Sequence, residues 1–380
     1  MIGKEIHNFA RELWSLNRSL TGEGVRETLS QISKHLPELK IKSVLSQTKV
    51  FDWTVPKEWI VREAYILTPS GEKICNFSEN NLHLIGYSEP FVGELSLNKL
   101  KEHLYTLPEQ PEAIPYITSY YKKRWGFCLS QNQLNILEDG KYKVLIDAKL
   151  FDGVLNYGEL LIRGKSEKEI FLSTYICHPS MANNELSGPT VTTFIAKWLK
   201  NINTLEYSYR IIFIPETIGS ITYLSKNYME MKKKIFAGFN VSCVGDDRAY
   251  SYIPSRNGNT ISDQIALHIL KWIDPQFVKY TWFDRGSDER QYCAPGIDLP
   301  IASILRTKYG QYPEYHTSLD DLDNVVTAKG LDGGYWAIRR AIEAIERNKK
   351  YKVSVLCEPQ MGKRGLYPTI SKKKRSEEIN

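Results

Sequence analysis

Four polar clusters in the second half of the chain have the residue types that bind a metal ion and activate water. They are residues 177–188, 215–220, 244–247 and 315–320, with residues 286–290 placed before the last of them. Histidine nitrogens and carboxylate oxygens are the donors of a catalytic zinc site, which keeps one position open for water. That water also needs a nearby carboxylate as general base. The clusters supply both kinds of group, because they include His178 and His316 together with Glu216 and Asp246.

The elements that must position these clusters follow an α/β pattern. From about residue 140 onward, apolar strand-like runs alternate with segments whose apolar residues recur at helical spacing. We expect strands at 169–177, 209–215, 234–245 and 299–305, and helices at 187–202, 221–231, 262–273 and 328–348. This alternation predicts a mixed, largely parallel, twisted sheet with helices on both faces. Ligands bind beyond the carboxyl ends of such strands, and the clusters fall at those ends.

Two further segments are assigned to the main domain. Residues 4–36 have apolar positions at three- to four-residue spacing, which predicts a helix. Residues 141–151 and 155–164 are predicted to pair as a hairpin at one edge of the sheet.

The stretch from 51 to 127 differs in composition, and we interpret it as a smaller, β-rich domain inserted into the main one. It is rich in Trp, Tyr, Pro and Asn and contains short strand-like runs. The catalytic domain is then expected to comprise residues 1–50 and 128–350, with a C-terminal tail at 351–380.

Each candidate residue also has a simpler interpretation. A histidine after a strand, such as His178, is more often a satisfied polar residue than a ligand. Glu216 could cap the helix that follows it, and Asp246 with Asp247 could form a turn. The other five histidines fall on predicted helices or in the insertion and are interpreted as structural. A shared site is favoured because all four clusters fall at predicted strand ends of one domain.

Composition narrows the class of protein. Of the 380 residues 42% are hydrophobic and 25% are charged, as in globular proteins. The net charge of +6 is concentrated in short clusters such as 232–234 and 372–375, so we expect no nucleic-acid partner. No apolar stretch approaches the roughly 20 residues of a membrane span, and the N-terminus lacks the apolar core of a signal peptide. Six cysteines without CxxC spacing are typical of free thiols, so we expect a cytoplasmic protein with no membrane partner.

The motif series resembles the co-catalytic zinc aminopeptidases. STYICHPS, ANNELSG, FIPETIGS, FNVSCVGD and EYHTSLDDLDNV follow the order of the metal-binding and catalytic motifs of that clan. Within the clan, CHPSMANNELSGP and GSDERQYCAPGIDLP are similar to a bacterial aminopeptidase-like family that carries an inserted domain, and the resemblance covers nearly the whole chain. It implies the zinc-aminopeptidase fold, with His178 as the first metal ligand, His316 as the last and Glu216 as the general base.

The chain departs from this pattern where further ligands are expected. The second Glu of the clan's Glu pair is Thr217 here, and the bridging Asp falls at Asn184, with Glu185 beside it. The Asp that follows the third strand falls at Ser242, and Ser180 stands where an Asp usually backs the first His. A standard two-zinc site therefore cannot be assembled from the matching positions alone.

Members of the family often end in a winged-helix module. Residues 357–371 look like its start, but a winged helix needs about 70 further residues by the usual size of domains. We therefore expect this module to be missing and residues 351–380 to be a remnant of its linker.

The first functional hypothesis is a metal-dependent, aminopeptidase-like hydrolase that cleaves an amide bond in a small substrate. One or two divalent ions, zinc by the resemblance, would be held by nitrogens of His178 and His316 and by oxygens of Glu185 and Asp246. Glu216 would act as the general base. Substrate contacts are expected from four further residues, which are Asp288, Arg290, Arg256 and Tyr315.

Two other hypotheses stay open. The same site could serve a deacylase or amidase that acts on an amino sugar or another N-acyl metabolite. The absence of the clan's Glu at position 217 and of its Asp at position 242 instead favours a non-catalytic binding protein on a decayed peptidase scaffold. The expected partner is a small peptide or an N-acyl metabolite, and a homo-oligomer is left open.

Overall fold

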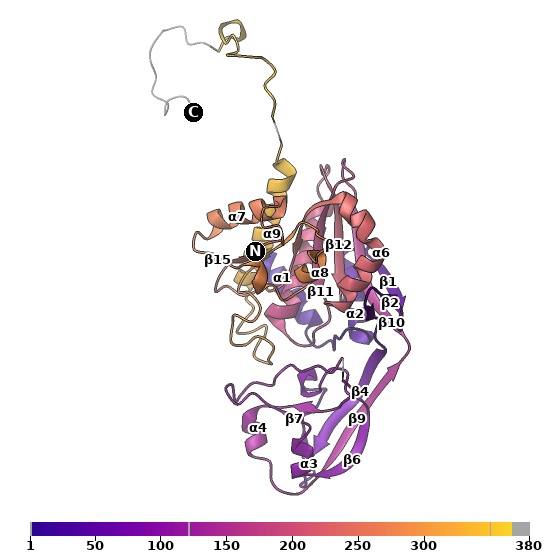
Figure 1. Cartoon of the computed structure of the whole chain (residues 1–380). Coiled ribbons are helices and arrows are strands. Elements are labelled where there is room, and N and C mark those ends of the chain that lie inside the picture. Colours follow the sequence, from indigo (N-terminus) through magenta and orange to yellow (C-terminus); the bar gives the residue numbers. More distant parts are fainter. Residues whose placement is uncertain (1, 121, 350, 367–380) are drawn as a thin grey trace. The chain divides into compact units, whose positions relative to one another are not determined.

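The structure is a computed structural model that describes residues 2–120, 122–349 and 351–366 (Figure 1). The chain divides into two compact units, residues 1–346 and 347–380. Within the described part of the second unit there is a single short 3-10 helix, Gly362–Arg364. All the elements that concern the site lie in the first unit. None of the helices in the described ranges is both long enough and apolar enough to cross a membrane.

An eight-stranded mixed sheet forms the centre of the first unit, in the order β1-β10-β12-β11-β13-β16-β14-β15. The four strands at its middle are parallel, and they are β11 (Glu169–Tyr175), β12 (Ser208–Ile214), β13 (Ile235–Asn240) and β16 (Ile301–Leu305). The outer strands are β1 (Lys40–Leu45), β10 (Val154–Ile162), β14 (Ser251–Ile253) and β15 (Val278–Lys279). This confirms the predicted class, a largely parallel α/β sheet.

Helices cover both faces of this sheet (Figure 1). Each face has its own apolar core, because successive side chains of a strand point to opposite faces. Ile170 and Leu172 of β11 belong to one apolar core, and Phe171 between them belongs to the other. The first core is completed by α1 (Ile2–Leu13), α2 (Glu23–His35), α5 (Ser187–Lys200), α7 (Ile261–Ile273) and α9 (Ala328–Arg347). The second core contains α6 (Ile218–Lys234) and α8 (Glu289–Tyr292).

The first predicted helix is interrupted. Residues 14–22 separate α1 from α2, so the single helix expected over 4–36 is wrong. Gly22 has a φ of 98°, a conformation that only glycine adopts readily and that a helix cannot continue. The interruption places a polar loop, including Arg18, inside the protein.

A second, four-stranded antiparallel sheet has the order β5-β4-β9-β6. Its strands are β4 (Glu58–Leu67), β5 (Lys73–Ile74), β6 (Phe91–Ser96) and β9 (Lys141–Phe151). The predicted hairpin of residues 141–151 with 155–164 is therefore wrong, because β9 pairs with β4 and β6 while β10 joins the large sheet. The small sheet thus extends beyond the predicted insertion of 51–127.

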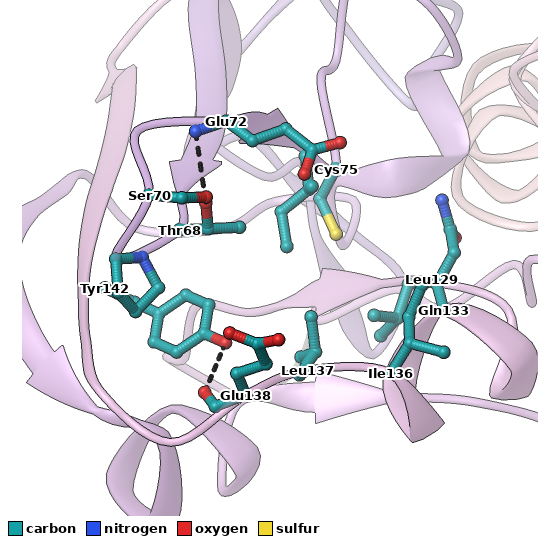
Figure 2. Close-up of a pocket in the computed structure, with 12 residues that line it drawn as sticks. Thr68, Ser70, Glu72, Cys75, Leu129, Gln133, Ile136, Leu137, Glu138 and Tyr142 are labelled. Carbon is teal, nitrogen blue, oxygen red and sulfur yellow. Dashed lines mark hydrogen bonds between the residues drawn. The ribbon is translucent and has the colours of Figure 1, made fainter.

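Short elements join these sheets. They are β2 (Lys49–Val50), β3 (Trp53–Thr54), η1 (Asn81–His83), α3 (Leu97–Lys101), β7 (Leu104–Tyr105), β8 (Phe127–Cys128), α4 (Gln131–Asn135), the π-helix η2 (Ala182–Leu186) and η3 (Trp282–Asp284). Figure 2 shows a cavity of about 390 Å³ beside the small sheet. Thr68, Glu72 and Gln133 line it, and the Tyr142 hydroxyl there donates to the carbonyl of Glu138 at 2.7 Å. None of its lining residues belongs to the four polar clusters.

The packing of α9 against the end of β13 gives a test of the fold. A Cβ atom at Gly330 would overlap the backbone carbonyls of Gly245 and Asp246. Gly330→Ala should therefore destabilise the protein by roughly 1–3 kcal/mol in urea unfolding, as overpacking does. Gly333→Ala is the matched control, because its Cβ would meet only the movable tips of Arg306 and Tyr250. Equal stability of the two variants would contradict this packing.

Candidate active site

His178 lies just beyond the carboxyl end of β11, as the α/β pattern predicts. Its Nδ1 donates to Oε2 of Glu185 at 2.8 Å, and both side chains are buried. Glu185 belongs to η2, the single π-helical turn that precedes α5, and such turns often occur at functional sites. The hydrogen bond engages Nδ1 of His178, which leaves Nε2, the nitrogen that faces Glu216 at 3.6 Å, as the one that could bind a ligand.

His316 comes from a different part of the chain and lies beside His178. The ring centroids of the two histidines are 5.7 Å apart, which confirms that they share one region. Nε2 of His316 is buried and has no hydrogen-bond partner among the residues that the structure describes. Burial and the neighbouring His178 lower the pKa of His316 to about 3, which favours the neutral ring. A neutral imidazole is the form that binds metals.

Glu216 follows β12 and completes the cluster. Its Oε2 lies 3.6 Å from Nε2 of His178, and its backbone N–H donates to the sulfur of Cys177 at 3.1 Å. The side chain is 21% exposed, so solvent still reaches the carboxylate. Burial raises the pKa of Glu216 above its usual value, and the His178 charge offsets part of that rise. A carboxylate in this setting can take up a proton and release it again.

Asp288 and Arg290 lie beside Glu216. The backbone N–H of Thr217 donates to Oδ1 of Asp288 at 2.7 Å, and Arg290 Nη2 donates to the Thr217 hydroxyl at 2.7 Å. Burial, followed by the charge of Glu216, raises the pKa of Asp288 to about 8. Thr217 has a φ of 61° and His316 a φ of 57°, and such strained backbone is concentrated at functional sites.

Position 184, where the clan has its bridging Asp, is occupied by a hydrogen-bonded amide. The Tyr175 hydroxyl donates to the backbone carbonyl of Asn184 at 2.7 Å and lies 3.2 Å from its side-chain Oδ1. Asp320 instead accepts the backbone N–H groups of Asn183 and Asn184 at 2.7 and 3.0 Å. The carboxylate of Asp320 therefore supports the turn.

Two predicted site residues have local partners outside the histidine pair. Oδ1 of Asp246 accepts the N–H of Thr307 at 3.0 Å, while its Oδ2 is buried without a hydrogen-bond partner in the described residues. No hydrogen bond or ion pair of those residues joins Asp246 to His178 or His316, and its role as an oxygen ligand stays a prediction. Arg256 forms an ion pair with Asp298, a partly exposed residue in the segment before β16, and its contact with a substrate also stays a prediction.

Tyr116, which the sequence did not single out, covers both histidines. Its ring makes edge contacts with His178 and His316 at centroid distances of 5.4 and 5.1 Å. Its backbone N–H donates to the carbonyl of His316 at 2.9 Å, and its hydroxyl lies 3.2 Å from that of Tyr120. Tyr315 stacks on the ring of His316 with the ring centroids 3.8 Å apart. The aromatic composition of the insertion was the signal in the sequence that pointed towards Tyr116.

The two histidines offer nitrogens for one divalent ion, and a catalytic zinc site usually adds a third protein ligand. Within 4 Å of the His178 ring nitrogens, the described residues place two carboxylates, Glu185 at Nδ1 and Glu216 at Nε2. A carboxylate-backed histidine is the usual arrangement of a metal-binding imidazole, and the partnerless Nε2 of His316 supplies a second nitrogen. A second ion lacks its bridging carboxylate, because position 184 is an amide.

A tighter group, Cys177, His178 and Glu185, also has its donor atoms within 4.8 Å of one another. The short distances in this group follow from the hydrogen bond between His178 and Glu185. A cation there would also approach the buried guanidinium of Arg18, which lies 3.6 Å from Glu185. We therefore assign the metal position to the Nε2 side of His178. Glu185, predicted as an oxygen ligand, then faces the opposite side of the ring.

Comparisons with known proteins concern the family and the fold of the chain. A family model described as a domain of unknown function (DUF4910) matches residues 7–348. A Clostridium acetobutylicum protein, provisionally named a polysaccharide biosynthesis protein with aminopeptidase-like domain, is 47% identical over 369 residues, which are 97% of this chain and 84% of that protein. A crystal structure of a provisionally named peptidase from the same organism superposes with a TM-score of 0.92 at 46% identity, covering 96% of this chain and 85% of that one.

More distant structures share the fold. A zinc aminopeptidase from Bacillus subtilis superposes with a TM-score of 0.66 at 12% identity, covering 92% of this chain and 96% of that one. At this identity the likeness concerns the fold alone. The central domain thus has the zinc-aminopeptidase fold.

The expectation that the winged-helix module is missing is wrong. A family model of a winged helix-turn-helix matches residues 349–380. The expectation relied on the size of complete modules, whereas sequence features of the module are present in this shorter stretch. Residues 367–380 of it lie outside the described residues. The expectation of no nucleic-acid partner followed from the distribution of charge, and it stays a prediction.

Proposed function

The chain belongs to the DUF4910 family, and we propose that it is a metal-dependent hydrolase that cleaves an amide bond in a small substrate, as an aminopeptidase does. One observation carries the proposal. His178, backed by a carboxylate, lies beside His316 with its partnerless Nε2 and beside Glu216, all beyond strand ends of a zinc-aminopeptidase fold.

Each of these residues has a role in the proposed reaction. Nε2 of His178 and Nε2 of His316 would hold the ion, and Glu185 orients His178 through Nδ1. When bound, a divalent ion, zinc by the likeness, would supply Lewis acidity, which brings the pKa of a coordinated water towards about 7 and polarises a carbonyl. Oε2 of Glu216 accepts the proton of the attacking water and passes it to the nitrogen of the leaving amine.

The surroundings of the cluster favour a small, polar substrate. Tyr116 and Tyr315 wall the two histidines, which leaves little room for a folded protein chain. Oδ2 of Asp288 is buried without a hydrogen-bond partner among the described residues. Its pKa of about 8 makes this carboxyl neutral near pH 7, and a substrate ammonium group beside it would favour the ionised form. Arg290, beside Thr217, is suited to a substrate carboxylate.

A second candidate is a deacylase of an amino sugar or another N-acyl metabolite. The name of the Clostridium acetobutylicum relative refers to polysaccharide biosynthesis, and aromatic rings such as those of Tyr116 and Tyr315 pack well against sugar rings. The proposed chemistry of amide cleavage is the same. Only the acyl and amine parts of the substrate differ.

Metal content and substrate panels test both candidates. Protein purified without chelator should contain about one zinc ion per chain, and a chelator should abolish hydrolysis that added zinc restores. Aminoacyl anilides should release free amino acid if the first candidate is right, and N-acetylated sugars should release acetate if the second is. A protein that binds no divalent metal would instead support the non-catalytic hypothesis.

We also propose that the protein works in a reducing compartment such as the cytoplasm. Its six cysteines all lie among the described residues and are free thiols. Five of them are buried, which is typical of structural cysteines in such a compartment.

A further inference from the structure

Arg18 is a buried cation behind the proposed metal site. Its side chain is fully buried, and it comes from the loop between α1 and α2. Nε donates to the backbone carbonyl of His178 at 3.0 Å, and Nη1 donates to the carbonyl of Leu13 at 2.5 Å. The same Nε lies 3.6 Å from Oε1 of Glu185. One guanidinium therefore touches both the backbone of His178 and the carboxylate that holds its ring.

Glu185 divides its two oxygens between these neighbours. Oε2 accepts the His178 Nδ1–H at 2.8 Å, while Oε1 faces Arg18 and has no hydrogen bond of its own in the described residues. Glu185 is oriented by the hydrogen bond at Oε2 and by the charge of Arg18 near Oε1, and the plane of the imidazole is oriented with it. The side chain is completely buried, and an unpaired charge would be unfavourable there.

The usual position for this backing carboxylate is occupied by another residue. Ser180 stands where related enzymes have an Asp, and its hydroxyl bonds to the side chain of Asn81. Ser180 therefore does not contact the His178 ring through any hydrogen bond in the described residues. The backing carboxylate comes instead from position 185, seven residues after His178.

We propose that Arg18 is a positioning residue, which acts through Glu185 to hold His178 in the orientation that binds the metal. This inference depends on the proposed metal site but not on the identity of the substrate. The rigid guanidinium suits this role, because Nη1 is anchored on the carbonyl of Leu13 while Nε donates to the carbonyl of His178 and brings the positive charge to 3.6 Å from Glu185. Lysine, with one nitrogen at the end of a flexible side chain, lacks two separate donors held in this geometry.

Zinc affinity, measured by competition with a chromophoric chelator, tests the arrangement without any substrate. Glu185→Gln should weaken zinc binding by about 10–100-fold, as loss of an outer partner does. Arg18→Met should also weaken zinc binding, by a smaller factor, and Arg18→Lys should not recover the wild-type affinity for zinc. In the Glu185→Gln background, Arg18→Met should cause little further loss, because the two residues act in series.

Arg210→Met is the matched control. Arg210 is also buried and pairs with Glu169 at 2.6 Å, but both residues lie on central strands away from the histidine cluster. This variant should lose stability without losing zinc affinity. If Glu185→Gln does not fold, the Arg18→Met/Glu185→Gln double variant removes both charges together and Glu185→Asp keeps the charge. Both should still bind zinc more weakly than wild type.

The outcomes separate the two proposals. Wild-type zinc affinity in folded Arg18→Met and Glu185→Gln would overturn the positioning role alone, as would an equal loss in Arg210→Met. Failure of the wild-type protein to bind zinc would overturn the proposed metal site and this inference with it.

Discussion

Glu216→Gln should reduce turnover of the substrate by about 10²-fold or more while the protein keeps its fold and its zinc, since this is the usual contribution of a general base. The carboxylate lies 3.6 Å from Nε2 of His178, next to the position assigned to the ion. Gln has the same size and can still accept a hydrogen bond, but its amide cannot take up a proton. The measurement compares turnover, zinc content and the thermal midpoint of variant and wild type.

The alternative role of Glu216, as a helix cap, predicts a different result. Loss of a cap would cost about 0.5–2 kcal/mol of stability and leave turnover largely intact. The structure already disfavours this role, because the cap position of α6 is Thr217 and not Glu216. Glu230→Gln on the same helix is the control for removing a carboxylate, and it should keep full turnover. A zinc-loaded Glu216→Gln protein with undiminished turnover would remove Glu216 from the mechanism, and one that had lost its zinc would make it a ligand.

His316→Ala should abolish tight zinc binding and hydrolysis together. A direct ligand contributes more than an outer partner, so the loss of zinc affinity should exceed about 10–100-fold. The local fold should survive, because the bond from Tyr116 goes to the backbone carbonyl of His316, which the substitution keeps. Zinc titration and circular dichroism of the variant measure the two effects separately.

His83→Ala is the control for removing a buried histidine. His83 and His178 are each 6% exposed, but Nδ1 of His83 bonds to the carbonyl of Cys128 beside the small sheet. Its loss should lower stability without changing zinc affinity. Retention of tight zinc binding by both His316→Ala and His178→Ala would show that the ion, if any, is held elsewhere.

The alternation of apolar runs and amphipathic segments was enough to determine the central sheet. β11 and β12 are buried at every position and mostly apolar, because helices cover both faces, and the helix after β11 shows a periodic apolar stripe. The polar residues that follow such strands, His178 and Glu216, must then meet at one edge of the sheet. For this reason the sequence alone located the centre of the candidate site.

The strand pairing of β9 and the positions of residues that reach the site from distant parts of the chain became known only from the tertiary structure. Strand β9 is amphipathic with a period of two, and that pattern cannot say which sheet it joins. Arg18 and Tyr116 lie 160 and 62 positions before His178, and nothing in their local sequence indicates that they would surround it. The sequence likewise does not indicate the local partners of Asp246 and Arg256, which are the N–H of Thr307 and the carboxylate of Asp298.

The orientation of the ligands is likewise a tertiary property. Sequence motifs identify which residues reach a strand end, but a side chain turns according to the partners packed around it. Glu185 illustrates the difference, because the sequence placed it near the ion while the buried guanidinium of Arg18 and Nδ1 of His178 turn it to the back of the imidazole. Periodicity and composition thus determined the scaffold and the meeting point of the clusters, and burial and charge pairing decided what each residue does there.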